Sequence, residues 1–200
     1  CRHMGLEVAV PDVNTAQMNY YPDIESGNRS SRIVYGLSAI RNVGEGIVSL
    51  LISERNSNGP FVDFYDFCER VDLQVLNRRA IEALIKAGAF DSLGHTRQGL
   101  LASYEQIIEQ TVSRRREKEM GVMTLFEVAP DDASQVFDDK IPIPEIEFER
   151  QQRLSFEKEM LGRYISDHPL RGYEGTLSRK CDATSQGVSS LDEGKVIKAV

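Results

Sequence analysis

The fold of this chain is decided by the run Tyr35-Gly36-Leu37-Ser38-Ala39-Ile40-Arg41-Asn42-Val43-Gly44-Glu45-Gly46. Leu37, Ile40 and Val43 recur every three residues, which predicts a short helix with one apolar face. Gly44-Glu45-Gly46 interrupts that spacing, because glycine tolerates tight backbone bends that other residues resist. Helical spacing then resumes at Ile47, Leu50, Leu51 and Arg55. The run therefore predicts two short helices joined by the turn Val43-Gly44-Glu45-Gly46.

A second glycine turn of similar design, Lys86-Ala87-Gly88-Ala89-Phe90, lies about 44 residues further along the chain. Asn77 can cap the helix before this turn, whose apolar face is Ile81, Leu84 and Ile85. A long helix is predicted after it, from about residue 96 to 120, because apolar residues repeat along one side. These residues are Leu100, Leu101, Tyr104, Ile107, Ile108 and Val112. Two such units in succession predict a mainly α fold with a tandem helix-hairpin-helix.

Both turns have the chemistry of an anion site. A glycine turn at the start of a helix leaves successive N–H groups pointing outward, at the positive end of the helix dipole. DNA phosphate is the natural anion for such turns, and it would be bound without any reading of the bases. We predict a DNA-backbone site made by the turns and the nearby cations: Arg41, Val43, Gly44, Glu45, Gly46, Arg78, Arg79, Lys86, Ala87, Gly88 and Ala89.

A simpler interpretation of either turn is that glycine only separates two helices. Two turns in matching helical frames favour the phosphate site over this alternative. The second turn has Ala89 where the first has its second glycine. It is therefore the weaker phosphate site, and its main role can be to pack against the first turn.

The regions around the two turns are predicted to be less regular. Residues 6–10 and 33–35 are predicted strands, separated in part by a loop or hairpin tip at residues 26–31. Residues 127–146 are acidic and contain three prolines, so we expect a linker with little core of its own. Helical spacing resumes around Leu154, Phe156, Met160 and Leu161, and the last twenty residues return to a strand-like pattern. Both ends of the chain look cut, so we expect a fragment of a larger protein.

A second candidate site is the apolar pentapeptide Val122-Met123-Thr124-Leu125-Phe126, which is followed by the acidic stretch. Apolar residues outside a core often mark an interaction site, and a Leu-Phe pair can anchor a short peptide in a partner's pocket. The alternative is that these side chains fold back on the long helix as a staple. Composition favours neither interpretation. The nearby Arg114-Arg115-Arg116 is expected to be a solvated helix end.

Composition and motifs restrict the other possible functions. The net charge is −7, but residues 32–90 carry seven basic and seven acidic side chains, which leaves room for a DNA-facing patch. The three cysteines are far apart, which argues against a zinc site and suits a reducing cytoplasm. No apolar run approaches the roughly 20 residues that span a bilayer, so we expect a soluble protein without membrane contact. No nucleotide-binding loop, nucleophile elbow or metalloprotease motif is present, so no catalytic residue and no cofactor is expected in the chain.

The chain resembles bacterial DNA polymerase III alpha subunits, a family of replicative polymerases, in the expected order over nearly its whole length. The runs that carry the resemblance are Cys1-Arg2-His3-Met4-Gly5-Leu6-Glu7-Val8, Pro11-Asp12-Val13-Asn14, the first turn with its preceding helix, Asp66-Phe67-Cys68-Glu69-Arg70-Val71-Asp72, Leu76-Asn77-Arg78-Arg79-Ala80, Leu84-Ile85-Lys86-Ala87-Gly88-Ala89-Phe90-Asp91, Glu157-Lys158-Glu159-Met160-Leu161-Gly162, Tyr164-Ile165-Ser166 and His168-Pro169-Leu170.

The resemblance implies five successive segments. Residues 1–35 would end a fingers domain, and residues 36–120 would form a tandem helix-hairpin-helix DNA-binding domain. Residues 121–147 would hold a clamp-binding peptide and the acidic linker, which are followed by a helical segment at 148–175 and the start of an OB-fold domain at 176–200.

The resemblance also implies the activity of a DNA-directed DNA polymerase, a nucleotidyltransferase that uses magnesium-bound deoxynucleotides. Its palm domain, with the metal-binding aspartates, would lie upstream, so this fragment would be inactive alone. The implied partners are primer–template duplex DNA, the sliding clamp and other replicase subunits. The clamp peptide maps onto residues 122–126, where Val122 stands in place of the glutamine with which that peptide commonly begins.

The leading hypothesis is thus a polymerase segment that grips duplex DNA through sequence-independent backbone contacts. One alternative is a protein-interaction scaffold whose main role is recruitment to the clamp, based on Leu125 and Phe126. Another is a helix-hairpin-helix DNA-repair module, which is disfavoured because no glycosylase or nuclease carboxylate cluster is visible.

Overall fold

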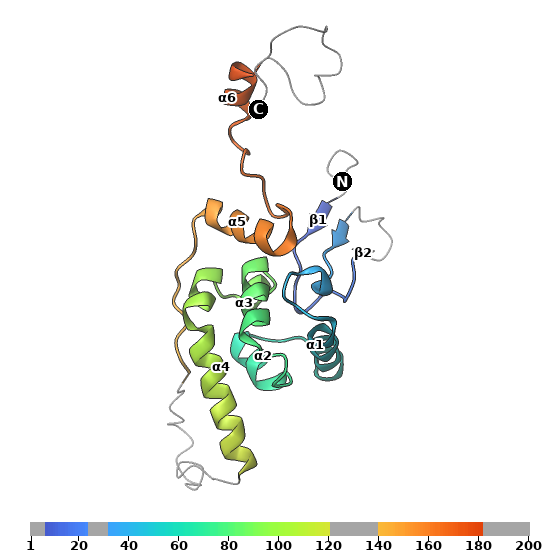
Figure 1. Cartoon of the computed structure of the whole chain (residues 1–200), viewed down its shortest axis with the longest axis vertical. Coiled ribbons are helices and arrows are strands. Elements are labelled where there is room, and N and C mark those ends of the chain that lie inside the picture. Colours follow the sequence, from blue (N-terminus) through green and yellow to red (C-terminus); the bar gives the residue numbers. More distant parts are fainter. Residues whose placement is uncertain (1–6, 24–31, 121–139, 182–200) are drawn as a thin grey trace. The chain divides into compact units, whose positions relative to one another are not determined.

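A computed structural model of the chain describes residues 7–23, 32–120 and 140–181, which form a mainly α fold with one small sheet, as the sequence predicts (Figure 1). The chain divides into two compact units, residues 1–166 and residues 167–200. The helices of the first unit are α1 (Glu45–Asn58), α2 (Phe64–Arg70), α3 (Arg78–Ala87), α4 (Arg97–Glu119) and α5 (Arg150–Leu161). In the described part of the second unit, α6 spans Glu174–Lys180, and the residues expected to begin an OB fold lie largely outside the described residues.

The small sheet contains β1 (Glu7–Ala9), β2 (Tyr21–Asp23) and β3 (Arg32–Val34), in the order β1-β3-β2. β3 pairs with β1 in parallel and with β2 in the antiparallel sense. The strands predicted at residues 6–10 and 33–35 are present with slightly shifted ends. β2 is not predicted, because Tyr21-Pro22-Asp23 carries a proline within a three-residue strand. β2 lies at the edge of the sheet and pairs with a neighbour on one side only. Pro22 fits there because the open side of an edge strand needs no N–H donor.

The segment between β1 and β2 is fastened to α1 and to the loop between α1 and α2. The buried guanidinium of Arg55 donates to the backbone carbonyls of Val13 and Ala16, at 2.8 and 2.9 Å. The Asn14 side chain accepts from the Phe61 N–H at 2.7 Å and donates to the Phe61 carbonyl at 2.9 Å. These contacts satisfy backbone groups that a buried irregular segment would otherwise leave unpaired. They place the inner face of α1 against the N-terminal segment.

The backbone approaches itself closely at Gly36, just before the first hairpin. A Cβ atom at this position would lie 2.5 Å from the carbonyl carbon of Asn19. Leu37 and Ser38 then donate their N–H groups to the carbonyls of Gln17 and Met18. Glycine is required here by space, because no larger residue allows the two backbone segments to lie so close.

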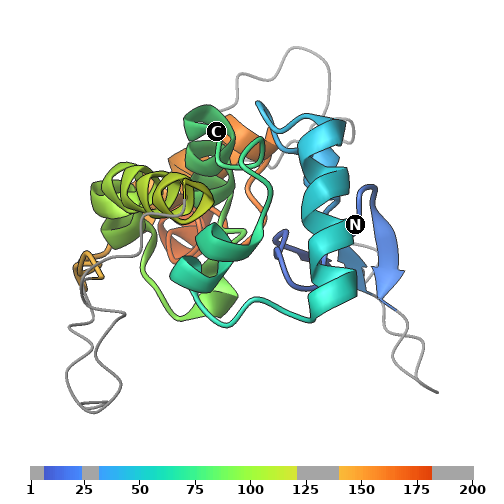
Figure 2. The same cartoon turned by 90° about the horizontal axis from the view of Figure 1, so that it is seen from below.

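Helices α2, α3 and α4 form the main core, with α4 and α1 on opposite sides of the α2–α3 pair in both Figure 1 and Figure 2. The rings of Phe61, Phe64, Phe67 and Phe90 contact one another, mostly edge to face, with ring centroids 4.9 to 6.1 Å apart. The predicted cap of α3 is confirmed, because the Asn77 side chain accepts from the N–H groups of Arg79 and Ala80. The predicted apolar face of α4 is confirmed as well, with Leu100, Tyr104, Ile107 and Ile108 buried.

Residues 140–147, which we call the strap, lie in extended form along the core. The Tyr65 hydroxyl donates to the Ile141 carbonyl at 2.5 Å, and the Thr96 hydroxyl donates to the Pro144 carbonyl at 3.4 Å. Ile141 and Ile143 pack partly buried against the core. This part of the expected linker therefore packs on the core through its isoleucines. The sequence does not predict this, because the residues around them are mostly acidic.

Helix α5 packs on α3 and completes the same unit. Its buried residues are Leu154, Glu157, Met160 and Leu161. The helix ends at Gly162, which adopts the left-handed conformation with φ +71°. This glycine ends the helix in the way that many helices end, leaving the last carbonyls of α5 available to other donors.

Candidate functional site

The first predicted turn joins a short 3-10 turn, Leu37–Ala39, to α1. The short helix predicted at residues 37–43 is limited to this 3-10 turn. Leu37, Ile40 and Val43 are all buried, and their spacing of three matches the three residues per turn of 3-10 geometry. Asn42 has a positive φ of 67°, which reverses the chain before Val43. The helix after the turn begins at Glu45, so Glu45 and Gly46 belong to the first turn of α1.

The start of α1 presents unpaired N–H groups to the solvent. Gly44, Glu45 and Gly46 are exposed, and Gly44 has no side chain with which to cap the helix. The first hydrogen bond of the helix joins the Val48 N–H to the Gly44 carbonyl at 3.1 Å. Within the described ranges, no carbonyl or side chain accepts from the N–H groups of residues 45–47. These are the orphan donors that a helix N-terminus offers to an anion.

The two glycines of this turn are not required by packing. A Cβ atom placed on Gly44 or on Gly46 would meet no other atom within 4 Å. Neither residue has the positive φ that favours glycine. The open space beside them leaves room for an approaching ligand to reach the backbone directly.

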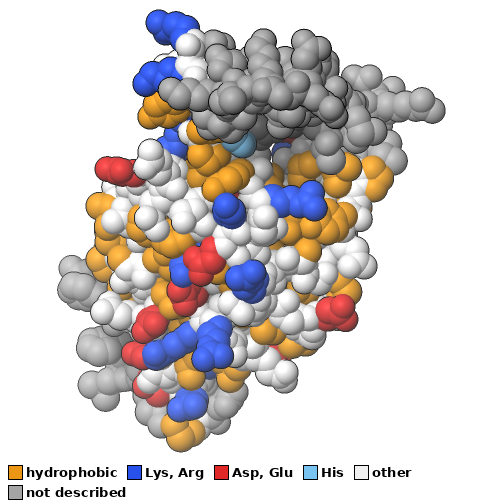
Figure 3. Space-filling view, turned by 45° about the horizontal axis from the view of Figure 1, so that its top comes forward, with side chains coloured by type: hydrophobic (Ala, Val, Ile, Leu, Met, Phe, Trp, Pro, Cys, Tyr) orange, Lys and Arg blue, Asp and Glu red, His pale blue; other side chains and the backbone are white. Residues whose placement is uncertain are grey.

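The predicted cations differ in what they contact. Arg41 and Arg79 are exposed, and in the part of the chain that the structure describes neither guanidinium has an ion-pair partner. Arg78 is held by Glu105, at 3.3 Å, and by Glu109 on α4. Lys86 is bound to Glu82 at 2.8 Å and lies 5.1 Å from the centre of the Phe156 ring. On the face drawn in Figure 3, basic side chains are interspersed with acidic and apolar ones.

The second predicted turn uses its own N–H groups to end α3. Gly88 is left-handed, with φ +82°, and its N–H donates to the Ile85 carbonyl at 3.0 Å. The Ala89 N–H donates to the Leu84 carbonyl at 2.9 Å, and Ala87 and Ala89 are completely buried. This is the hydrogen-bonding pattern of a Schellman C-cap. The geometry favours a packing role for Ala87, Gly88 and Ala89, and phosphate contact at this turn stays a prediction.

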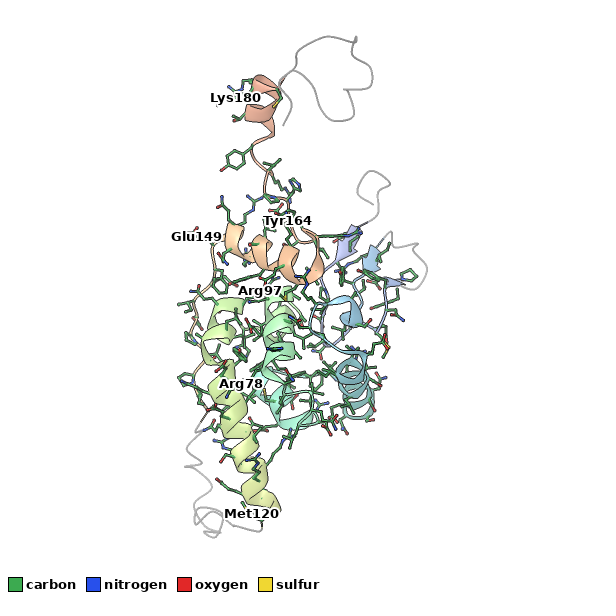
Figure 4. The ribbon with its side chains drawn as sticks, in the orientation of Figure 1. Arg78, Arg97, Met120, Glu149, Tyr164 and Lys180 are labelled. Carbon is green, nitrogen blue, oxygen red and sulfur yellow. The ribbon has the colours of Figure 1, made fainter. Side chains whose placement is uncertain are left out.

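The sequence does not predict an ion cluster beside the second turn, in which Arg97 and Glu157 are buried and Asp91 is exposed. The Arg97 guanidinium, at the end of α4 that faces α5 in Figure 4, contacts Asp91 at 2.7 Å and Glu157 at 3.3 Å. Burial opposes the charge of Arg97, but the hydrogen bonds and charges of Asp91 and Glu157 outweigh it and raise the pKa of Arg97. Sixty positions separate Arg97 from Glu157, so no local pattern could reveal the pair.

The end of α4 differs from the solvated helix end that the sequence suggests. The guanidinium of Arg115 donates to the carbonyls of Val71, at 2.8 Å, and Cys68, at 2.7 Å, and also to that of Glu69. Arg115 thus binds carbonyls at the C-terminal end of α2, which receive no hydrogen bond from within that helix. Arg115 is therefore a structural residue.

The second candidate site, Val122-Met123-Thr124-Leu125-Phe126, lies outside the described residues. In the described parts of the chain, no three His, Cys, Asp or Glu side chains form a group that could hold a metal ion. The described helices include none that is long and apolar enough to cross a membrane.

Comparisons with known proteins agree on the type of chain. A family model described as a helix-hairpin-helix motif matches residues 5–100. The DNA polymerase III subunit alpha of Mycobacterium tuberculosis (strain H37Rv) is 38% identical over 195 residues, which are 96% of this chain and 16% of that protein. The subunits of Pseudomonas aeruginosa and Haemophilus influenzae are each 37% identical, over 90% and 98% of this chain and 16% of their own length.

This chain thus spans about one sixth of the length of the curated relatives that it matches. The family model covers both glycine turns, and the similarity to the polymerase subunits extends over nearly the whole chain. Residues 5–100 thus match the helix-hairpin-helix motif family, and nearly the whole chain is similar to one segment of the bacterial DNA polymerase III alpha subunits.

Proposed function

We propose that this chain grips duplex DNA by its phosphate backbone as a segment of a replicative DNA polymerase. The observation that carries this proposal is the exposed start of α1. There, the N–H groups of residues 45–47 lack acceptors within the described ranges, next to two glycines with open space beside them. A phosphate oxygen can approach such a helix start closely and accept from several N–H groups at once. The relationship to polymerase subunits and to the helix-hairpin-helix family supports DNA as the anion.

The two hairpins have different roles in this proposal. The first hairpin, residues 37–58, provides the phosphate contact, with Arg41 as the nearby cation. The second hairpin, from α3 to α4, supports it, because the N–H groups of Gly88 and Ala89 already have acceptors. Of its cations, Arg79 is exposed and can add a further phosphate contact, whereas Arg78 is neutralised by Glu105 and Glu109.

The proposed contact is independent of base sequence, because backbone N–H groups and arginine guanidinium groups bind phosphate oxygens and do not reach the base edges. Binding then depends on the release of counterions from DNA and weakens steeply as salt rises. The net charge of −7 further limits the affinity of the isolated chain. We expect micromolar or weaker binding at physiological salt, on the order of non-specific DNA binding in general.

The activity of the whole polymerase belongs to this proposal too. We assign DNA-directed DNA synthesis, with its magnesium ions, to parts of the polymerase other than this segment. This chain would hold the primer–template duplex, act in the cytoplasm together with other replicase subunits, and show no nucleotidyltransferase activity alone. Incubation of the purified chain with a primed template, magnesium and deoxynucleotides tests this last point, and primer extension would contradict it.

The DNA-binding proposal is tested by a double substitution, Gly44→Val with Gly46→Val. The added side chains have room in the protein but cover the N–H groups that would bind phosphate. We expect the affinity for a short fluorescent duplex to fall about tenfold or more for every duplex sequence, since each lost charge-assisted hydrogen bond contributes about 1.5–3 kcal/mol.

Gly175→Val is the matched control for this experiment. Gly175 is the second residue of α6, as Gly46 is of α1, and a Cβ atom there would meet only an arginine side chain at 4.0 Å. The control should bind duplex DNA as the unsubstituted chain does. Unchanged binding by the Gly44→Val, Gly46→Val variant would remove the first hairpin from the proposed site.

Docking on the sliding clamp through residues 122–126 is the second candidate function. The apolar Leu125 and Phe126 support it. So does their position between α4 and the strap, two segments that both belong to the first compact unit. Titration of a peptide spanning residues 121–127 against the clamp should give saturable binding that Phe126→Ala abolishes. Binding that is absent, or that survives Phe126→Ala, would exclude this site.

A further inference from the structure

The end of α5 is hydrogen-bonded to the first hairpin, although more than 100 residues separate them in the sequence. The Tyr35 hydroxyl donates to the Leu161 carbonyl at 2.9 Å. The Arg41 N–H donates to the Met160 carbonyl at 3.0 Å. Both acceptors belong to the last turn of α5, where the carbonyls receive no hydrogen bond from within the helix itself.

These two hydrogen bonds lie on either side of the 3-10 turn. Tyr35 comes just before Leu37–Ala39, and Arg41 comes just after it. The Tyr35 side chain is buried, so its hydroxyl has lost water as an alternative partner. Between Tyr35 and Arg41 the hairpin is therefore held at two points on one helix end, while Gly44, Glu45 and Gly46 remain exposed.

Helix α5 is itself held in place from the other side. The buried carboxylate of Glu157 accepts from the N–H groups of Ile165 and Ser166, at 3.2 and 3.1 Å. It also contacts the Arg97 guanidinium, which belongs to the second hairpin. Arg97 appears in Figure 4 where α4 begins, next to α5. The sequence of contacts thus runs from the second hairpin through α5 to the turn of the first.

We propose that α5 positions the first hairpin for phosphate binding. Tyr35 is the positioning residue: its hydroxyl binds the end of α5 and does not contact DNA. This inference rests on the DNA-binding function proposed above. Its physical basis is preorganisation: N–H groups form an anion site only while they converge on one point. A turn that is already fixed loses less conformational entropy on binding than a mobile one.

Tyr35→Phe tests the proposal, because it removes one hydroxyl and keeps the buried ring. Duplex affinity should fall about three- to tenfold, which corresponds to the net contribution of roughly one hydrogen bond. The slope of affinity against salt should stay unchanged, since Tyr35 neutralises no phosphate. Amide hydrogen exchange at residues 43–47 should become faster.

Tyr65→Phe is the matched control. Its hydroxyl also donates to a distant backbone carbonyl, that of Ile141, but on α2 and the strap. This variant should lose comparable stability to urea and retain full duplex affinity. An equal loss of affinity in both variants would show that general destabilisation explains the effect, and would overturn the positioning role.

A double-mutant cycle separates this inference from the proposed function. In a chain that already carries Gly44→Val and Gly46→Val, Tyr35→Phe should lower affinity no further, because both changes act on the same turn. An additive loss would overturn the inference. If the glycine variant loses binding but Tyr35→Phe does not, only the positioning role fails. If the glycine variant binds normally, the proposed function fails first.

Discussion

Arg41 lies exposed at the first hairpin, whereas Arg78 is held between two glutamates of α4. The sequence assigns both to the same predicted site. Their surroundings differ in charge: Arg78 has two carboxylates in contact, which cancel its attraction for phosphate and would themselves repel DNA. Arg41 has no such partner within the described residues, so its charge is available to an anion.

We therefore expect unequal effects from Arg41→Gln and Arg78→Gln. Arg41→Gln should weaken duplex binding and lower the slope of log affinity against log salt by about one, the value expected for one lost phosphate contact. Arg78→Gln should weaken binding less than Arg41→Gln does, since Glu105 and Glu109 hold the Arg78 guanidinium and keep it from contacting a phosphate. Fluorescence anisotropy at several salt concentrations measures both. Equal losses would show that Arg78 leaves its glutamates to bind DNA.

The Arg97–Glu157 pair should be costly to break from one side only. Arg97→Leu leaves the buried Glu157 carboxylate without its cation, and we expect the free energy of unfolding in urea to fall by about 3–5 kcal/mol. Adding Glu157→Gln should recover part of this loss, because the uncompensated charge is gone while the amide oxygen can still accept from the N–H groups of Ile165 and Ser166. Arg171→Ala, which removes an exposed ion pair with Asp167, serves as the control and should cost less than about 1 kcal/mol. A double variant no more stable than Arg97→Leu would contradict this account.

At the scale of helices, the two ends of α4 contact different segments of the chain. The first turn of α4 holds Gly99 against the strap, where a Cβ atom would lie 2.0 Å from the Pro144 carbonyl oxygen. The last turns hold Arg115 against the carbonyls of α2. Both contacts join α4 to segments that have little regular structure or are very short. The helix therefore organises its neighbours as well as contributing its apolar face.

Arg115→Ala should loosen α2 specifically. The loss of hydrogen bonds to three carbonyls should lower the free energy of unfolding by about 1–3 kcal/mol. Amide hydrogen exchange should become faster in α2 before it changes in α3. Arg116→Ala, at an exposed neighbouring position, should stay within about 0.5 kcal/mol of the unsubstituted chain. If both variants behave alike, Arg115 is not a structural residue in solution.

Gly99→Ala should displace the strap, because the clash is with backbone that cannot rotate away. We expect faster tryptic cleavage after Lys140 while the helix content by circular dichroism stays the same. Gly46→Ala, at a helical glycine with open space around it, is the control and should leave the cleavage rate unchanged. Equal cleavage rates for all three proteins would mean that the strap is not held at this position.

The elements that the sequence predicts well are those whose signals are local. Asn77 caps α3 two and three residues away, and the apolar face of α4 repeats within one helix. What the sequence does not predict depends on contacts between distant residues. Pro22 lies in a strand only because β3 pairs with it, and Arg115 is a structural residue only because α2 ends beside it. For the candidate site, the glycine turn follows from the sequence. The hydrogen bonds from the first hairpin to the end of α5 do not, since their acceptors are backbone carbonyls, which every residue type carries.

At the scale of the whole first unit, three tyrosines predict a loss of stability in alkaline solution. Burial, above all, raises the pKa of Tyr21 and Tyr35 above the ordinary value of 10, and raises that of Tyr104 to about 12. The folded protein therefore holds these protons more tightly than the unfolded chain does. The resulting stability is complete below pH 10 and is lost as the pH rises towards 12.

Urea unfolding at pH 8, 10 and 11 measures this loss. The urea concentration at half unfolding should be lower at pH 11 than at pH 10. This decrease should be smaller in Tyr104→Phe, which has no hydroxyl to ionise at that position. A fall of the same size in both proteins would mean that other groups cause the alkaline sensitivity.

The hydrogen bond from Tyr35 to Leu161 also has a consequence for the order in which the protein matures during translation. The two residues are 126 positions apart. At roughly 5–20 residues per second, on the order of ten seconds pass between the synthesis of Tyr35 and that of its acceptor. Throughout that interval the nascent first hairpin can collapse onto its neighbours, but its turn lacks the end of α5. The surface proposed to meet DNA would therefore be among the last parts of this unit to reach its final form on the ribosome.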